Sequence, residues 1–291
     1  MLMTILEQGL IYGILALGLL ITYRILDFPD LTVDSSFPLG AAVSAILTVN
    51  GVNPGLTLLA AIAAGAGAGL ITGLIHVKCK VRDLLSGIIT MTGLYSINLR
   101  IAGKANVPLF ANETLFKSSF TKSLPAAVAP YATLVMILII ALLAKLLLDW
   151  FLKTKAGYLL RAAGDNPAVV TTLARDQGSV KIVGLMIANA LVSLAGAVLC
   201  QQQRFFDISM GTGTMVIGLA SVIIGTNLFK HASFVKSTTA VLVGSIIYKA
   251  CVSVALAMGM ESQDMKLVTA VLFLLILVAG TMPRKKVRIH A

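Results

Sequence analysis

The polar side chains that could do chemistry in this 291-residue chain are few, and they lie within or beside long apolar stretches. Lys249, next to Tyr248, falls near the middle to outer half of one such stretch. A charged side chain at that depth usually faces a bundle interior or a wet cavity. Lys249 could therefore pair with a carboxylate of a transported molecule, or its long side chain could extend outward to the membrane surface.

Two further groups of polar residues complete a candidate substrate pathway. Asp34, Ser35 and Ser36 come just before an apolar stretch and could cap its first turn. If that helix is broken, its positive end could face an anionic group in the pathway. Asn98 and Asn189 lie inside other apolar stretches, and for both we favour hydrogen bonds between helices over contact with a ligand.

Groups that make or break bonds are missing from the sequence. It shows no Walker glycine loop, no paired carboxylates and no Ser–His–Asp set. Cys79, Cys200 and Cys251 are scattered singly, so neither a zinc site nor a disulfide framework is supported. We therefore expect a non-catalytic chain that binds neither a metal nor a cofactor of its own.

The composition indicates a membrane protein. Hydrophobic residues make up 58% of the chain and charged residues only 12%, about half the charge of a soluble domain. The apolar residues form runs of about 15 to 25, long enough to cross a ~30 Å hydrocarbon core as helices. Unbroken runs exclude the alternating pattern of a β-barrel, so the predicted fold class is an all-α polytopic membrane helical bundle.

Nine stretches are candidate membrane spans. The second and the seventh are short and could be broken or re-entrant, so we expect eight or nine crossings. In the third stretch, Gly65, Gly69 and Gly73 repeat every four residues and so share one helix face, which favours close packing against another helix. The nine stretches are Thr4–Tyr23, Phe37–Val49, Gly55–Val77, Leu84–Ile101, Ala126–Phe151, Ile182–Gln202, Thr214–Phe229, Val235–Met258 and Lys266–Met282.

The basic residues predict the orientation of the chain. With nine spans, four basic clusters fall on one side, which must be the cytoplasm. The N-terminus then faces outward and the C-terminus inward. The net charge of +11 has this origin, and we do not expect nucleic-acid binding. One conflict remains at Arg24–Ser36, which falls inside yet holds three aspartates against one arginine; acidic residues count little in this rule. The clusters are Lys78–Arg82, Lys153–Lys181, Lys230–Lys236 and Arg284–Arg288.

The connection over residues 153–181 is too long and too helix-forming for a simple loop. Gly157 and Gly164 are expected to allow turns on either side of Leu160 and Arg161. Asp165 could cap a further helix that begins at Asn166 or Pro167 and carries a short apolar stripe. The residues alone leave two interpretations open: an amphipathic helix resting on lipid headgroups, or a docking element for a soluble partner. The stripe consists of Ala168, Val169, Val170 and Leu173.

The same connection carries a pattern of motifs. It reads Lys155-Ala-Gly157, then Arg161-Ala-Ala-Gly-Asp-Asn-Pro167-Ala, then Leu173-Ala-Arg-Asp176, and Leu194-Ala-Gly-Ala197 follows in the next span. This pattern resembles the cytoplasmic loop of ABC importer permeases of the branched-chain amino acid and ribose type. In that family the loop is a coupling helix that sits in a cleft of the ATPase subunit. The resemblance implies such a role for Gly157, Arg161, Ala162, Gly164, Asp165, Asn166, Pro167, Ala168 and Leu173.

The beginning of the chain carries the resemblance further. Gly13–Leu19, Tyr23–Asp30 and Phe37–Ala42 match the family pattern, whereas Asp27-Phe28-Pro29-Asp30 and Thr32-Val33-Asp34 depart from it. With these departures the chain is similar to a branch paired with lipoprotein-type binding proteins, several of which are linked to aromatic amino acids. The resemblance implies a single transmembrane permease domain over residues 1–291, with the coupling loop at about residues 153–181.

What the resemblance implies is an importer subunit in a bacterial inner membrane. Its partners would be a second copy of itself, an ATP-binding cassette ATPase dimer that uses ATP and Mg²⁺, an extracytoplasmic substrate-binding protein and membrane lipid. The expected substrate is an amino acid, with a sugar or a nucleoside as the alternative. An ion-coupled secondary transporter is a further alternative, but carboxylates and histidines are nearly absent from mid-span positions, where such transporters place their relays.

Overall fold

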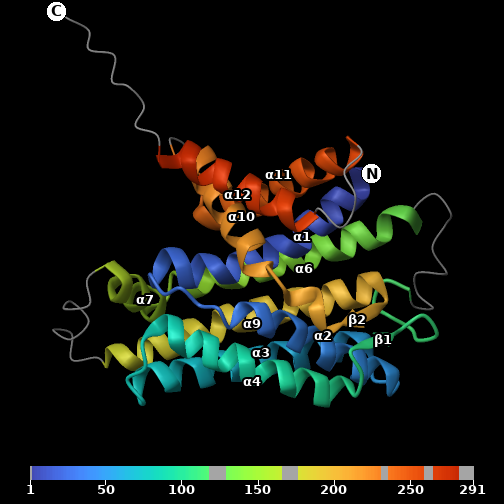
Figure 1. Cartoon of the computed structure of the whole chain (residues 1–291), viewed down its shortest axis with the longest axis horizontal. Helices are drawn as coiled ribbons and strands as arrows, with labels where there is room; N and C mark the ends of the chain where they lie inside the picture. The colour runs from blue at the N-terminus through green and yellow to red at the C-terminus, as the bar shows by residue number, and fades with distance from the viewer. Residues whose placement is uncertain (1, 118–128, 166–175, 231–234, 259–264, 282–291) are drawn as a thin grey trace, which may run out of the picture.

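The computed structural model describes residues 2–117, 129–165, 176–230, 235–258 and 265–281, which form a helical bundle with one two-stranded sheet (Figure 1). The predicted all-α class is confirmed. Seven helices of the described chain are long and apolar enough to cross a membrane, and α2 and α12 are shorter, with 17 residues each. The elements are α1 (Leu2–Leu19), a π-helix (Leu20–Ile25), α2 (Val33–Val49), α3 (Pro54–Val77), α4 (Asp83–Ala102), β1 (Asn106–Pro108), α6 (Ala129–Phe151), α7 (Lys155–Asp165), α9 (Gln177–Gln203), β2 (Phe205–Asp207), a 3₁₀-helix (Ile208–Gly211), α10 (Thr214–Leu228), α11 (Ser237–Ala257) and α12 (Met265–Thr281).

Local signals explain where several helices begin and end. Asn53 caps α3, since its side chain accepts a hydrogen bond from the N–H of Gly55 at 2.9 Å, and Pro54 occupies the first helical position. Gly103 ends α4 with a φ of +71°, a left-handed conformation that glycine adopts without strain. These two signals place the boundaries of α3 and α4 close to the predicted ones.

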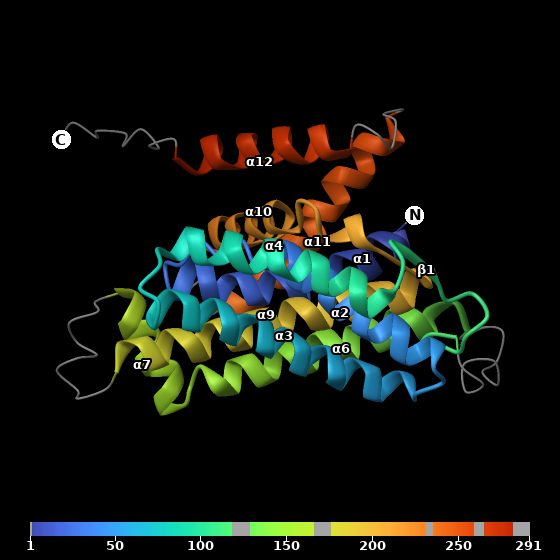
Figure 2. The same ribbon diagram turned by 60° about the horizontal axis from the view of Figure 1, so that its bottom comes forward.

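The centre of the bundle is formed by α1 and α9. In each of them 67% of the most apolar window is buried, against 28% for α4 and α6. α9 packs on α3, α2 and α1, while α12 packs mainly on α10 and α11 and lies along one edge of the bundle (Figure 2). The apolar faces of α4 and α6 are therefore turned outward, where lipid would cover them.

The glycine face of α3 is confirmed as a packing surface against α9. A Cβ added to Gly65 would overlap the backbone of Asn189, and one at Gly69 would lie 2.8 Å from the Cα of Met186. A Cβ at Gly73 would lie 3.0 Å from the Cα of Ile182. The missing side chains let the two helices approach closely over three successive turns, as small residues do in membrane bundles.

The two ends of the bundle differ in charge. β1 pairs with β2 in antiparallel register, with Val107 opposite Phe206, and the sheet lies at the end where α1 begins (Figure 1). α7 lies at the opposite end. There the α3–α4 connection, with Lys80 and Arg82, shares a pocket with Lys181 near the start of α9. The basic clusters that the structure describes thus gather at the α7 end of the molecule.

Candidate functional site

A group of polar side chains is buried where α9 meets the start of α2. The amide nitrogen of Asn189 donates to one carboxylate oxygen of Asp30 at 2.8 Å, and its oxygen accepts from the Ser36 hydroxyl at 2.7 Å. The N–H of Thr32 donates to the other oxygen of Asp30 at 2.9 Å. Asp30, Ser36 and Asn189 have no exposed surface. The prediction that Asn189 joins segments by hydrogen bonds is confirmed, whereas the sequence analysis did not identify Asp30 as a site residue.

Asp34 holds the start of a different helix from the one predicted. α2 begins at Val33, four residues before the predicted Phe37, so Asp34, Ser35 and Ser36 lie inside α2 and do not cap it. The Asp34 carboxylate instead accepts hydrogen bonds at the start of α10. Its donors are the N–H of Gly213 at 3.2 Å, the N–H of Met215 at 2.8 Å and the Thr214 hydroxyl at 3.0 Å.

The hydrogen bonds of Asp30 and Asp34 account for the unusual acidic segment before α2. Asp30, which is buried, and Asp34, which is half-buried, accept hydrogen bonds from backbone N–H groups, so they are not free charges of an aqueous loop. The prediction that the second span is short is confirmed by the 17 residues of α2. The seventh span is longer than predicted, because α10 continues the 3₁₀-helix before it and the segment Ile208–Leu228 has 21 residues, enough to cross a membrane. The N-terminus of α10 meets the first turn of α2 through Asp34, and Gly211 there lies against the backbone of the same residue.

Asn98 and Ser35 join α4 to α2. The amide nitrogen of Asn98 donates to the carbonyl oxygen of Ser35 at 3.0 Å, and the Ser35 hydroxyl donates to the carbonyl oxygen of Met91 at 2.8 Å. The predicted helix-to-helix hydrogen bond of Asn98 is therefore confirmed. Its side-chain oxygen is buried and has no hydrogen-bond partner among the described residues.

Lys249 lies inside the bundle and does not extend to the surface. It is 8% exposed, and its ammonium nitrogen lies 4.1 Å from the ring centroid of Tyr12 on α1. Tyr12 in turn stacks on Phe37 of α2, with ring centroids 6.1 Å apart. No carboxylate lies within ion-pair distance of Lys249 in the part of the chain that the structure describes. A buried cation over an aromatic face, without a counter-ion, is suited to contact an anionic group that enters the bundle.

The predicted turns at Gly157 and Gly164 are wrong, because both residues lie within the continuous helix α7. A Cβ on Gly157 would lie 2.5 Å from the Cα of Leu152, and one on Gly164 would overlap the carbonyl oxygen of Ile25. These glycines allow α7 to pack tightly on the end of α6 and on the π-helix. Leu160 is buried in the same contact, so α7 is a fixed part of the bundle.

The remaining coupling residues divide into two groups. Arg161 and Asp165 are exposed on α7, and Ala162 is half-buried. Asn166, Pro167, Ala168 and Leu173, with the predicted helix that they would start, lie outside the described residues. Asp176, where the description resumes, caps α9: the Ser179 hydroxyl donates to its carboxylate at 2.7 Å, and so do the N–H groups of Gly178 and Ser179 at 3.1 Å. These hydrogen bonds hold the pKa of Asp176 below its usual value.

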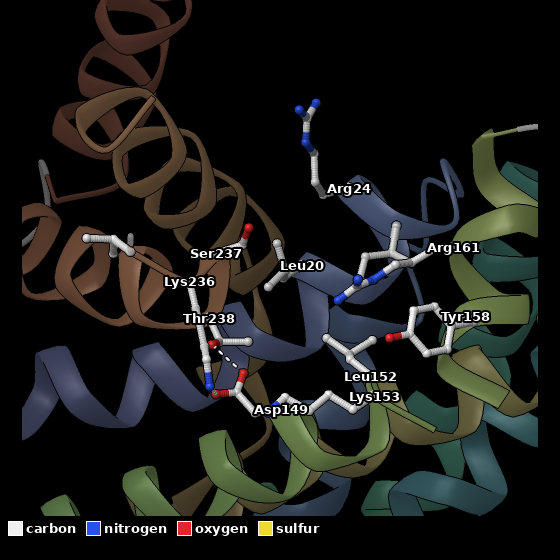
Figure 3. Close-up of a pocket in the computed structure, with 12 residues that line it drawn as sticks. Leu20, Arg24, Asp149, Leu152, Lys153, Tyr158, Arg161, Lys236, Ser237 and Thr238 are labelled. Carbon is white, nitrogen blue, oxygen red and sulfur yellow. Dashed lines mark hydrogen bonds and ion pairs between the residues drawn. The ribbon is translucent and has the colours of Figure 1, made fainter. Parts of the chain in front are cut away.

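A pocket of about 490 Å³ lies beside α7, at the ends of α1, α6 and α11 (Figure 3). In it the Asp149 carboxylate accepts from the Lys236 ammonium at 3.0 Å and from the Thr238 hydroxyl at 2.7 Å. Asp149 also forms an ion pair with Lys145, one turn earlier on α6, at 3.4 Å. Among the described residues no group of three histidine, cysteine, aspartate or glutamate side chains could hold a metal ion.

Several known proteins similar to this chain are permeases. A tyrosine transport system permease protein of Clostridioides difficile is 45% identical over 279 residues, 96% of this chain and 91% of the relative. The ribose import permease protein of Escherichia coli strain K12 is 27% identical over 279 residues, 94% and 83% of the two chains. A nucleoside ABC transporter permease protein of Lactococcus lactis is 32% identical over 138 residues, 46% and 39% of the two chains.

No solved structure matches the chain at a significant level. Residues 1–279 match the family described as the permease component of the branched-chain amino acid transport system. That match covers nearly the whole chain, with every described helix and strand except the last two residues of α12, and the bundle of apolar helices agrees with it. The chain therefore belongs to this family of ABC transporter permeases and is a multi-pass, non-catalytic membrane subunit.

Proposed function

We propose that this chain is the membrane subunit of a binding-protein-dependent importer of amino acids, and of aromatic amino acids in particular. The observation that carries the substrate class is the 45% identity to a tyrosine transport permease over 96% of the chain. The second candidate is a sugar or a nucleoside, favoured by the weaker similarity to the ribose and nucleoside permeases.

The surroundings of Lys249 support an amino acid. An amino acid presents a carboxylate, and Lys249 is a buried cation without an acidic partner among the described residues. The ring of Tyr12 lies beside Lys249 and stacks on that of Phe37, so the cation sits in an aromatic environment. Ser36, Asn98 and Asn189 already bond to neighbouring segments, so we assign them to holding the pathway helices in place. Asp34 has the same role at the junction of α2 and α10, and Ser35 has it between α2 and α4.

We infer that α7 and the residues after it connect the bundle to the ATPase. α7 packs on the π-helix that continues α1, and on α9, the two helices at the centre of the molecule. A partner that displaced α7 would therefore move the pathway as a rigid body. The complex would contain two copies of this chain, an ATPase dimer that uses ATP and Mg²⁺, and an extracytoplasmic binding protein. It would lie in a bacterial inner membrane with the C-terminus in the cytoplasm.

The substrate is tested by reconstitution with the ATPase and the binding protein in proteoliposomes. We expect ATP-dependent accumulation of labelled tyrosine that unlabelled ribose or a nucleoside does not inhibit. Lys249→Met should reduce accumulation at least tenfold, whereas Lys249→Arg, which keeps the cation, should retain a measurable part of it. Saturable accumulation of ribose without accumulation of tyrosine would reject the amino acid assignment.

The coupling role is tested separately by co-purification from detergent. We expect the native chain to retain the ATPase subunit, and Arg161→Glu or Ala168→Glu to lose it. Asn106→Glu on β1, at the opposite end of the bundle, is the matched control and should retain it. If the native chain and all three variants recovered the ATPase subunit equally, this segment would not be its docking site.

A further inference from the structure

The pocket beside α7 carries an excess of positive charge. Arg24 from the π-helix, Lys153 after α6, Arg161 from α7 and Lys236 before α11 all line it. Among the lining residues the one carboxylate is Asp149, and it is already neutralised by Lys236 and by Lys145 behind it. Arg24, Lys153 and Arg161 have no acidic partner among the residues that line the pocket. Arg161 and the hydroxyl of Tyr158 point from α7 toward Leu152 and Asp149 (Figure 3).

The start of α11 adds backbone donors to these cations. Lys236, Ser237 and Thr238 line the pocket, and Lys236 occupies the N-cap position of α11 without a side-chain hydrogen bond to the first turn. The N-terminus of a 21-residue helix carries a partial positive charge, and its first N–H groups have no acceptor within the helix. An anion such as a phosphate group would satisfy both the cations and these donors.

The rest of the pocket is apolar and lies at the edge of a lipid-facing surface. Leu20, Ile25, Leu152 and Val235 contribute side chains to the pocket wall. On α6 an exposed apolar stripe runs through Leu142, Leu146 and Trp150 and ends one turn before Lys153. Tryptophan followed by lysine at the end of such a stripe is typical of the boundary between hydrocarbon and headgroups. A ligand with a phosphate and hydrocarbon chains fits this combination better than a free phosphate ester does.

We propose that this pocket binds the phosphate headgroup of an anionic phospholipid from the cytoplasmic leaflet, with the acyl chains along the exposed face of α6. The headgroup would contact Lys153, Arg161 and Lys236 and so hold α7 to the end of α6 and the start of α11. Arg24, whose guanidinium points away from these three in Figure 3, would add its positive charge from the π-helix. Basic pockets between membrane helices on the cytoplasmic side recognise anionic headgroups in this way. The proposal does not depend on which substrate the permease carries.

The chain offers its own probe for the lipid next to this site, because Trp150 is its single tryptophan, is exposed, and lies near the end of α6, three positions before Lys153. The experiment compares quenching of Trp150 fluorescence by brominated phosphatidylglycerol and by brominated phosphatidylcholine, in nanodiscs of graded lipid composition. We expect brominated phosphatidylglycerol to quench Trp150 fluorescence at a lower mole fraction than brominated phosphatidylcholine does. The double variant Arg24→Gln with Lys153→Gln should lower that preference about 25-fold, since each basic side chain near an anionic surface strengthens binding about fivefold.

Two matched variants separate the pocket from general effects. Lys78→Gln with Lys80→Gln removes the same charge from the α3–α4 connection and should keep the native preference. Arg24→Lys with Lys153→Arg keeps the positive charge of the pocket, so this variant should also keep the native preference for phosphatidylglycerol. Equal quenching by the two lipids in the native protein would overturn the proposal, and so would loss of the preference in either matched variant.

Two further arms identify the source of the anion. Soluble glycerol phosphate, which carries the same charge without acyl chains, should not relieve quenching by phosphatidylglycerol at millimolar concentration. Full relief of the quenching would show that the pocket binds a free anion, and it would overturn the proposal that the ligand is a lipid. If the double variant kept its lipid preference but no longer captured the ATPase subunit, the pocket would belong to the protein partner instead.

Discussion

Asn189 donates a hydrogen bond to the buried carboxylate of Asp30 from a distant helix. If Asn189 were shortened, the hydrogen bonds that remain to Asp30 among the described residues would come from Thr32, two positions along the chain. We therefore predict that Asn189→Ala destabilises the protein by about 1–3 kcal/mol, the usual cost of leaving buried polar groups unpaired. The measurement is the denaturation midpoint in detergent, followed by circular dichroism.

Ala188→Gly, one position away on the same buried helix, is the control for loss of side-chain volume. The double variant Asp30→Leu with Asn189→Leu removes both polar partners, and it should recover part of the loss seen in Asn189→Ala. If Asn189→Ala were no more harmful than Ala188→Gly, the hydrogen-bonded group would not contribute to stability.

The polar residues show what a sequence can predict at this level. Asn98 and Asn189 were correctly expected to join helices, because an amide inside an apolar span has few other ways to be satisfied. The roles of Asp30 and Asp34 could not be predicted, since their partners Asn189 and Met215 lie 159 and 181 positions away. In sequence these aspartates are indistinguishable from charges in an aqueous loop.

The contact between α3 and α9 depends on a glycine at each of three successive turns of α3. We predict that Gly69→Ala costs about 1–3 kcal/mol, because the added methyl group overlaps the backbone of Leu185 and forces the helices apart. Gly67 lies on the same helix with nothing within 4 Å of its Cβ position. Gly67→Ala should therefore be neutral or stabilising by up to about 1 kcal/mol. Equal thermal stability of the two variants would contradict this account of the contact.

The start of α10 depends on a carboxylate from another helix. We predict that Asp34→Ala lowers stability by about 1–2 kcal/mol, because it leaves the N–H groups of Gly213 and Met215 without an acceptor. Asp34→Asn keeps one side-chain oxygen and should lie between the native protein and Asp34→Ala. Hydrogen exchange of the amides in the first turn of α10 is the direct measurement. Unchanged exchange rates in both variants would show that Asp34 does not hold this helix end.

The helices themselves were largely predictable, because a run of apolar residues long enough to cross a membrane has few alternatives to a helix. The error at α7 had a specific cause. Gly157 and Gly164 look like turn residues in sequence, but each is required by a close backbone contact, with Leu152 and with Ile25. Such contacts depend on how α7 packs against α6 and the π-helix, which local sequence does not encode.

The orientation of the complete chain in the membrane can be tested with its own cysteines. Cys79 is exposed in the α3–α4 connection, at the same basic end of the bundle as α7, and Cys200 is buried. Cys251 is exposed but lies within the apolar helix α11, where lipid would shield its thiol from a reagent that stays in water. If the basic end faces the cytoplasm, a membrane-impermeant maleimide should label Cys79 in inside-out vesicles and leave it unlabelled in intact spheroplasts.

The opposite pattern is expected for a cysteine placed at the other end of the bundle. Asn106 is exposed on β1, so Asn106→Cys in a Cys79→Ser background should react in intact spheroplasts and be protected in sealed inside-out vesicles. The Cys79→Ser chain alone should stay unlabelled in both preparations, which would confirm that Cys251 is shielded by lipid. Labelling of Cys79 from outside would reverse the orientation. The basic pocket and α7 would then face away from the ATP supply, and a coupling role at that end of the molecule would be physically excluded.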